Sequence, residues 1–589
     1  MEVAAPVGGR PDETVAEPRR RPGAEVGIPP LVTLLAVGLG LAAGWHGVDV
    51  AASVHRIDEF GRYGWSLWDG AWYGGQWTLD YSVLFAPAAW LLGLPALSLM
   101  AAMVATVAFR DLAARAADRT DARAVAATEP SRWAPVLGRL PAAARPSGRG
   151  MITPGAVLAA AVVLAVSNLV QTSIGQLPYL TGEAVGLAAL ALAARRRWLA
   201  AGALALMCSL LSPLAGLFLG LSLGAWWLRT VPWPARGIET GRRAGAGRRI
   251  GPLVGIAALA VAAAAPIVAT SALFPGEGQM PFSVTDCCWD LAIAAAVGLA
   301  APRRLRVLRT GVVLYAIGLV ASLAVASPIG GNMGRLGDAL ALPVATLLLW
   351  SRWRAVLGLV AIPLFLSSWV PAADAIVHGS ASPSTTAAFY RPLDRWLAAR
   401  DPGGIWGRVE VVPTFYHWES VYVANVVPLA RGWERQSDVT LSPLFYRSGP
   451  ISTAAYHRWL VASGVRWVAV PATKLDYGGT AEAAAIDRGV PGLRVAWRDA
   501  RWRVYSVAGS TGLVAGPARV TRVGNASLSV RTERAGTVTV RVRDNADWRI
   551  TAGTGCLAPA ADHWIALRAP AAESVTLRVS FSGRPSACG

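Results

Sequence analysis

The chain has 589 residues, of which 54% are hydrophobic and only 15% are charged. Soluble globular proteins carry about 25% charged residues, so this deficit and a mean hydropathy of +0.42 exclude an ordinary soluble protein. The net charge of +19 comes from arginines in short clusters between apolar runs. That pattern is typical of membrane topology signals and argues against nucleic-acid binding.

The N-terminal segment 1–27 is rich in proline, glycine, glutamate and arginine, and it cannot bury a hydrophobic core. We predict that it is a disordered tail. Its basic run, Arg19 to Arg21, comes before the first apolar run and should therefore stay in the cytoplasm. No short apolar stretch is followed by a small-residue cleavage site, so we predict no cleaved signal peptide.

Segment 28–371 contains repeated apolar runs close to the roughly 20 residues that a membrane helix needs. We predict a polytopic α-helical membrane domain with eleven spans, near 29–45, 95–109, 154–171, 183–194, 198–211, 214–228, 252–270, 289–302, 310–326, 339–350 and 355–371. With this count every arginine cluster lies on the cytoplasmic side and the C-terminal region lies outside the cell membrane. The short spans that meet at Ser212 and Pro213 are typical of broken helices, which also occur in transporters.

The outer loop 48–87 is too polar to span a bilayer and too aromatic to be a plain linker. Asp58 and Glu59 are interpreted as a general base or as ligands of a metal or substrate, with solvated loop acids as the alternative. Asp69 lies among aromatic residues and glycines, which suits a sugar or a lipid head group. The rings that could stack on such a ligand, or simply anchor the loop at the membrane surface, are Trp68, Trp72 and Tyr73.

Two further outer turns carry polar side chains. In 327–338, Asn332 and Arg335 lie among glycines, and Arg335 could clamp a phosphate or pair with Asp338 or an acid of the first outer loop. In 172–183, Gln176 could contact substrate, although a loop with a helix cap is the favoured explanation.

The C-terminal part changes character. Segment 372–510 alternates short β-like runs with helical stretches, which predicts an extracytoplasmic α/β domain. Its charged residues around His417 and Arg431 could form a polar surface over the membrane cavity, and a satisfied structural network is the favoured interpretation. Segment 511–589 shows strict alternation with glycine and asparagine turns, which predicts a β-sandwich-like domain. Cys556 and Cys588 both fall in it and could form a disulfide outside the cell. No CxxC pair or HExxH spacing occurs, so no structural zinc site is predicted.

Several motifs appear in the order of one known superfamily. They are TrpTyrGlyGly at 72–75, SerProLeuAlaGly at 212–216 and GlyGlyAsnMetGlyArgLeuGly at 330–337. With the order of the domains, they resemble the GT-C superfamily of polytopic membrane glycosyltransferases. More narrowly, they resemble the bacterial membrane proteins labelled 6-pyruvoyl-tetrahydropterin-synthase-related and their YfhO-like relatives. The similarity covers about residues 29–510.

This resemblance implies a reaction and roles for some residues. An acid of the first outer loop would activate the acceptor hydroxyl, and Asp58 and Glu59 match that position best, with Asp69 second. Arg335 would hold the phosphate of a lipid-linked, polyprenyl-phosphate sugar donor, and the acceptor would be an envelope glycan or lipid. The cofactor stays open, with a divalent cation as the candidate. The alternatives are a membrane transporter and a non-catalytic envelope scaffold of the same fold.

Overall fold

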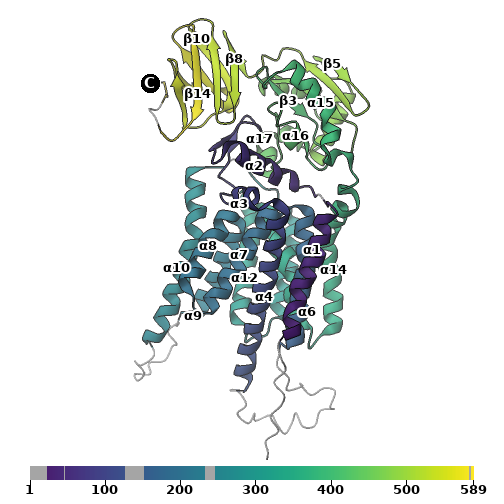
Figure 1. Cartoon of the computed structure of the whole chain (residues 1–589), viewed down its shortest axis with the longest axis vertical. Helices are drawn as coiled ribbons and strands as arrows, with labels where there is room; N and C mark the ends of the chain where they lie inside the picture. Colours follow the sequence, from purple (N-terminus) through teal and green to yellow (C-terminus); the bar gives the residue numbers. More distant parts are fainter. Residues whose placement is uncertain are drawn as a thin grey trace, which may run out of the picture.

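The computed structural model describes residues 23–45, 47–125, 152–231, 246–276, 278–582 and 586–588. Most of the predicted tail, 1–22, therefore lies outside the described residues. The first helix begins at Gly23, a few residues before the predicted span, and includes Pro29 and Pro30. Figure 1 shows a layer of long helices below and two smaller domains above it.

The helical layer is built from long, mostly apolar helices at each of the eleven predicted ranges. They are α1 (Gly23–Ala42), α4 (Leu94–Val125), α6 (Pro154–Ile174), α7 (Leu177–Ala194), α8 (Trp198–Leu211), α9 (Pro213–Thr230), α10 (Ala246–Leu273), α11 (Val284–Ala300), α12 (Arg306–Ala324), α13 (Arg335–Leu349) and α14 (Arg354–Asp374). Among the described residues, seven helices are long and apolar enough to cross a membrane. The chain is therefore a multi-pass membrane protein, and the number of eleven crossings remains a prediction.

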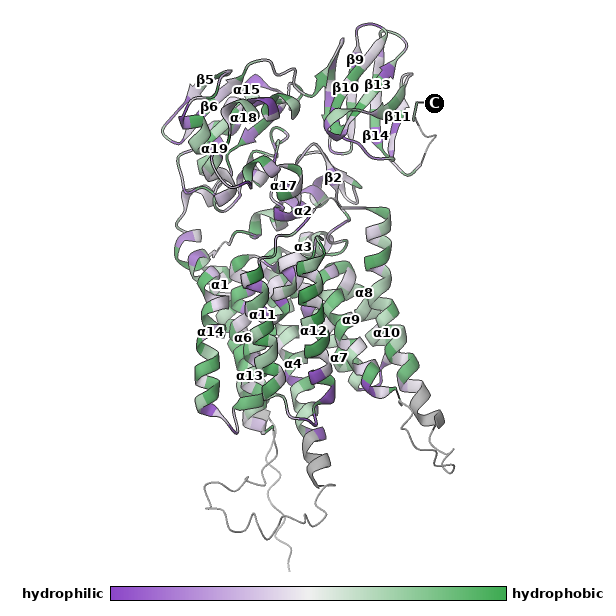
Figure 2. Cartoon of the chain, turned by 180° about the vertical axis from the view of Figure 1, so that it is seen from behind, coloured by the Kyte–Doolittle hydropathy of each residue, from purple (hydrophilic) through white to green (hydrophobic). Residues whose placement is uncertain are grey.

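Hydropathy follows the same layering. In Figure 2 the flanks of the helices are hydrophobic, whereas hydrophilic residues gather at their lower ends and in the upper domains. At the lower end α4 continues to Val125, well past the predicted span that ended at 109. Asp111 pairs there with Arg115 one turn later, at 2.9 Å, and with Arg195 between α7 and α8, at 2.7 Å. Such pairs stabilise a helix after its apolar run has ended.

The outer loop 48–87 forms a layer between the helices and the upper domains. It consists of α2 (Val50–Tyr63), a hairpin of β1 (Trp68–Asp69) and β2 (Gln76–Trp77), and the start of α3 (Phe85–Leu92). Helix α2 is amphipathic and buries one side. It ends at Gly64, whose φ of 62° lies in the left-handed region that glycine adopts without strain.

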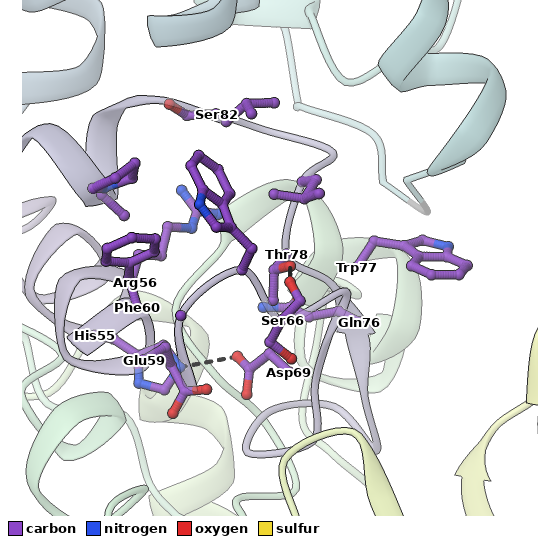
Figure 3. A pocket seen from close by; sticks show the side chains of 16 residues that line it. His55, Arg56, Glu59, Phe60, Ser66, Asp69, Gln76, Trp77, Thr78 and Ser82 are labelled. Carbon is purple, nitrogen blue, oxygen red and sulfur yellow. Dashed lines mark hydrogen bonds and ion pairs between the residues drawn. The ribbon is translucent and has the colours of Figure 1, made fainter. Parts of the chain in front are cut away.

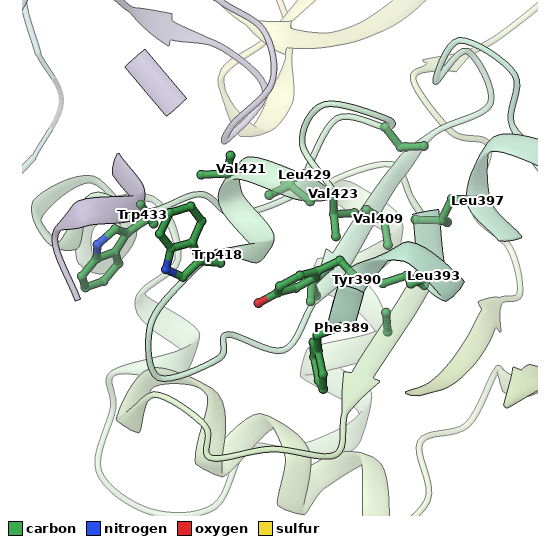
Figure 4. Packing of buried hydrophobic residues seen from close by; sticks show 14 of the residues in the cluster. Phe389, Tyr390, Leu393, Leu397, Val409, Trp418, Val421, Val423, Leu429 and Trp433 are labelled. Carbon is green, nitrogen blue, oxygen red and sulfur yellow. The ribbon is translucent and has the colours of Figure 1, made fainter. Parts of the chain in front are cut away.

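The α/β domain has a four-stranded mixed sheet with strand order β3-β4-β6-β5. Its strands are β3 (Arg408–Val411), β4 (Val465–Pro471), β5 (Leu493–Arg498) and β6 (Trp502–Val507), and its helices are α15 (Ala387–Arg400), α16 (Glu419–Tyr422), α17 (Arg435–Leu441), α18 (Thr453–Ala462) and α19 (Tyr477–Asp487). Figure 4 shows the buried residues that fill this domain, among them Phe389, Tyr390 and Trp418. Val50 and Trp72 of the outer loop belong to the same core, so the loop is packed into the domain.

The last domain is a sandwich of two antiparallel sheets, with strand orders β12-β13-β10-β7 and β11-β14-β9-β8. Its strands are β7 (Val514–Ala515), β8 (Ala518–Gly524), β9 (Ser527–Thr532), β10 (Gly536–Arg543), β11 (Trp548–Ala552), β12 (Cys556–Pro559), β13 (Trp564–Ala569) and β14 (Ser574–Val579). A disulfide joins Cys556 to Cys588. Trp68 and Trp77 of the hairpin pack into the sandwich core, so the outer loop contacts both upper domains.

Candidate functional site

A pocket opens within the outer loop, on the side of the hairpin that faces α2 (Figure 3). It spans about 550 Å³ of empty space, which includes solvent at its open side. Its wall is formed by α2, by the hairpin and by the chain that leads into α3. The polar residues of the wall are His55, Arg56, Glu59, Ser66, Asp69, Gln76, Thr78 and Ser82.

Three side chains converge at one end of this pocket. His55 and Glu59 are four residues apart on α2, and this spacing places them on the same face of the helix. Asp69 lies opposite them on β1, and its Oδ2 is 2.9 Å from His55 Nε2. Figure 3 shows the three side chains turned toward one another. One potential ligand atom from each of the three lies within 4.8 Å of the others, a geometry that could hold a metal ion.

The surroundings hold this cluster in place. The His55 ring is stacked on the Trp72 ring with centroids 4.0 Å apart, and Trp72 Nε1 donates to Ser420 O of the α/β domain. The backbone N–H of Ala71 donates to Asp69 Oδ1 at 2.8 Å. The sandwich domain contributes Asn525, whose Oδ1 accepts from Gly70 N. Side chains fixed in this way need little reorganisation when a ligand binds.

The two acids of the cluster, Glu59 and Asp69, lie in different surroundings. Burial, reinforced by the negative charge of Asp69, raises the pKa of Glu59 to about 9. Glu59 is 9% exposed. Because its pKa is raised to about 9, it carries a proton near neutral pH. Asp69 accepts two hydrogen bonds, from the imidazole of His55 and from the backbone of Ala71.

The third predicted acid, Asp58, has a different environment. It is partly exposed on α2, its charge acts on Tyr422 of the α/β domain, and it does not line the pocket. Asp58 and Glu59 follow each other in the chain, but consecutive helix residues point about 100° apart. The structure therefore brings together Glu59 and Asp69 and leaves Asp58 outside.

The predicted aromatic residues are largely enclosed. Trp68 packs edge-on against Trp77 and Trp548, on the opposite side of the hairpin from Asp69. Trp72 and Tyr73 are 0% and 2% exposed. Tyr73 Oη contacts the backbone of Glu434. These rings join the outer loop to the upper domains, and the stacking surface that remains open on the pocket is Trp65, which is 54% exposed.

The other predicted substrate residues lie away from the pocket wall. Arg335 pairs with Asp49 just before α2, at 3.6 Å, so its partner is an acid of the first outer loop. Asn332 donates to Pro328 O within its own turn. Gln176 occupies the position before α7 without a side-chain capping bond.

The two basic residues of the pocket, His55 and Arg56, were not singled out from the sequence. His55 could have been found, since a histidine and a glutamate four residues apart share one face of an amphipathic helix. Arg56 had no local signal. It forms an ion pair with Glu434 and lies over the Tyr81 ring at 4.3 Å. Both partners are far from Arg56 in the sequence, so no local pattern indicates these contacts.

A separate charged network stabilises the α/β domain. Arg431 is 4% exposed and contacts Glu410, Glu482 and Asp438. Arg435 makes two hydrogen bonds to Asp476, at 3.0 and 2.8 Å. These groups form a buried network of ion pairs in which Glu410 Oε2 and Asp438 Oδ1 have no hydrogen-bond partner among the described residues, and they do not line the pocket in the outer loop.

Comparison with known proteins adds one structural similarity. No protein-family model matches the chain, and no curated protein matches it. Among solved structures, it is similar to the crystal structure of ArnT from Cupriavidus metallidurans in the apo state. That similarity has a TM-score of 0.32 and 13% sequence identity, and covers 81% of this chain and 98% of ArnT. At this identity and TM-score the similarity establishes neither a superfamily nor an activity or substrate.

Proposed function

We propose that the chain is a membrane glycosyltransferase, which transfers a sugar from a polyprenyl-phosphate donor to a glycan or lipid of the cell envelope. The observation that carries this proposal is the cluster of His55, Glu59 and Asp69 in a pocket between the membrane helices and the upper domains. A prenyl chain stays in the bilayer, whereas a phosphate and a sugar reach the interface. A pocket at this level suits both a lipid-linked donor and an acceptor from outside.

Aromatic residues support this placement. Trp65 at the pocket and Trp90 on α3 are 54% and 57% exposed, and both contact Phe60 edge-on. Tryptophan favours the membrane–water interface because its ring is apolar and its N–H is polar. The pocket rim therefore has the chemistry of a surface that meets lipid head groups.

Asp69 is the best candidate for the general base. In the proposed step, the acceptor oxygen forms a bond to the anomeric carbon while the bond from that carbon to the phosphate oxygen breaks. Asp69 takes the acceptor proton, and polyprenyl phosphate leaves with the bonding electrons. Glu59 is protonated and cannot serve as the base, whereas Asp58 does not line the pocket. His55 acts as a positioning residue because it holds Asp69 Oδ2.

The donor phosphate needs a positive partner. Among the described residues that line the pocket, Arg56 is the arginine. Its guanidinium lies between Glu434 and the Tyr81 ring. Arg335 is bound to Asp49 and lies outside the pocket wall. We therefore assign phosphate binding to Arg56 in preference to Arg335.

The test compares two conservative variants in proteoliposomes supplied with polyprenyl-phosphate sugars. Asp69→Asn should lower the transfer rate by about 10²–10⁴-fold, the usual contribution of a positioned general base. Asp58→Asn is the matched control from the same loop and should transfer sugar at the normal rate. Equal unfolding temperatures of the two variants would show that folding is intact. If Asp58→Asn is inactive and Asp69→Asn is active, the assignment is wrong.

A transporter is the second candidate, and one observation favours it. Glu183 and Gln171 form a 2.9 Å hydrogen bond within the helical layer, and they are 7% and 4% exposed. Ionisable residues inside membrane domains often mark the path of a substrate or an ion. Solute uptake by the same proteoliposomes, without sugar transfer from any polyprenyl-phosphate donor, would replace the transferase proposal with this one.

A further inference from the structure

We propose that His55, Glu59 and Asp69 form a binding site for a divalent transition-metal cation, Mn²⁺ or Zn²⁺, at the end of the pocket. The sequence contains none of the usual spacings of metal ligands, and this site arises only when α2 folds against β1. A potential ligand atom from each of the three side chains lies within 4.8 Å of the others. Small movements of the side chains would bring three such atoms around one ion, whose ligand bonds are about 2.0–2.2 Å long.

Unsatisfied atoms are the second, independent observation. His55 is 1% exposed, and its Nδ1 has no hydrogen-bond partner. Glu59 Oε2 is likewise buried without a partner. A buried polar atom without a partner costs about 1–3 kcal/mol, so such atoms need an explanation. An ion bound by this cluster would displace the proton of Glu59, give Glu59 Oε2 a partner and balance the negative charge of the Glu59 and Asp69 carboxylates.

The surroundings resemble the outer shell of a metal site. Metal ligands are normally oriented by further contacts that fix their direction. The Trp72 ring fixes the plane of the His55 imidazole, and the Ala71 N–H fixes Asp69 Oδ1 while Oδ2 faces His55. Both contacts come from the segment just after β1, so the hairpin orients two of the three ligands.

The donor set selects the class of ion. Imidazole nitrogen suits zinc and other transition metals, and carboxylate oxygen suits manganese and magnesium. One nitrogen with two carboxylates therefore favours Mn²⁺ or Zn²⁺ over Ca²⁺, which takes six to eight oxygen ligands. Three protein ligands leave coordination positions open toward the pocket. Under the proposed transferase function, on which this role rests, the ion would act as a Lewis acid toward a phosphate or hydroxyl oxygen of the substrate.

The test measures metal directly in the full chain, purified in detergent without a histidine tag. The protein is treated with EDTA and then dialysed separately against Mn²⁺, Zn²⁺, Mg²⁺ or Ca²⁺, and bound metal is counted by mass spectrometry. We expect about one equivalent of Mn²⁺ or Zn²⁺, and weaker binding of Mg²⁺ and Ca²⁺. Addition of Mn²⁺ or Zn²⁺ should also raise the unfolding temperature, since the ion binds the folded state.

Three variants and a control connect the ion to this site. His55→Gln, Glu59→Gln and Asp69→Asn should each weaken binding by at least about tenfold and abolish the rise in unfolding temperature. Asp58→Asn should bind metal like the wild type. Unfolding temperatures in EDTA show whether each variant is folded. If one variant is misfolded, metal binding by the other two variants tests the site.

The proposal is overturned if the wild type retains no Mn²⁺ or Zn²⁺, or if folded variants bind the ion as tightly as the wild type. Its failure is distinct from failure of the transferase function. Sugar transfer by a protein that retains no Mn²⁺ or Zn²⁺ would leave the transferase and remove the cation site. Metal binding at these three residues without any sugar transfer would leave the cation site and remove the transferase.

Discussion

At the scale of single residues, burial controls the charge of the acids in the outer loop. Asp80 follows the hairpin and lies near Arg56, Glu434 and Gly276. Burial, together with the negative charge of Glu434, raises the pKa of Asp80 to about 7, although Arg56 and nearby backbone N–H groups oppose the shift. The folded protein therefore holds a proton on Asp80 that the unfolded chain has already lost.

This difference predicts a pH-dependent stability. Between about pH 4 and pH 7 the folded state binds more protons at this group than the unfolded state, so the free energy of unfolding falls as pH rises. Asp80→Asn removes this dependence. The variant should match the wild type near pH 4 and be more stable near pH 8, by up to about 4 kcal/mol.

Thermal unfolding in detergent across this pH range measures the effect. Asp118→Asn, which changes an exposed acid at the opposite end of the helical layer, serves as the control for removing one carboxylate. Loss of stability in Asp80→Asn at every pH would mean that Asp80 is ionised in the folded protein and pairs with Arg56.

At the scale of elements, α2 connects the membrane helices to the α/β domain. Arg335 at the start of α13 pairs with Asp49, the residue before α2, at 3.6 Å. Trp433 Nε1 donates to Val48 O at 2.7 Å, and Arg62 near the end of α2 donates to Asn425 at 2.8 Å. Because His55 and Glu59 lie between these attachments, contacts with both regions set the position of the site.

A double-mutant cycle tests the pair that ties α2 to α13. Arg335→Gln and Asp49→Asn should each lower stability slightly, and the double variant should lose no more than one single variant. The expected coupling is about 0.5 kcal/mol, since both side chains are partly exposed, at 19% and 31%. Arg352→Gln at the opposite end of α13 is the control.

The same variants separate this structural role from phosphate binding. If Arg335 acts through Asp49, both single variants change donor binding equally, whereas a direct contact with the donor phosphate affects Arg335→Gln alone. The second result would restore Arg335 to the substrate site.

At the scale of the whole molecule, the apolar flanks of the helices separate two polar ends (Figure 2). The upper end carries the pocket and both C-terminal domains, and the lower end carries arginines such as Arg195, which pairs with Asp111. Arginine near membrane helices favours the cytoplasmic side. We therefore expect the upper domains to be extracytoplasmic, in a cell membrane protein whose N-terminus is cytoplasmic.

Cysteine labelling tests this orientation. Arg197→Cys and Ser448→Cys place single exposed thiols at the two ends, in a background where the exposed Cys288 is replaced by serine. In intact cells a membrane-impermeant reagent should modify only Ser448→Cys, and permeabilised cells should allow both. Modification of both in intact cells, or of Arg197→Cys alone, would place the pocket in the wrong compartment for an envelope acceptor.

The sequence by itself determined the local structure of this protein. Apolar runs and strict alternation are read over a few neighbouring residues, and helices or strands occur where these patterns predict them. Thus α8 and α9 meet at Ser212, and β4 covers the predicted run 466–470. The boundaries of the domains at 371 and 510 remain predictions. The sequence also directed attention to the outer loop, where two of its three candidate acids line the pocket.

Only the tertiary structure decided which side chains meet. The contacts that define the site join distant residues, such as Trp72 with Ser420 and Arg56 with Glu434, and such contacts have no local periodicity. They enclose Trp72 and Tyr73, which the sequence suggested as stacking surfaces. Glu59 and Asp58 point in different directions from α2, so Glu59 lines the pocket and Asp58 does not. The fold of the hairpin brings Asp69 to His55. A pattern along the chain reveals which residues share a face, whereas the partner of that face depends on how the elements pack.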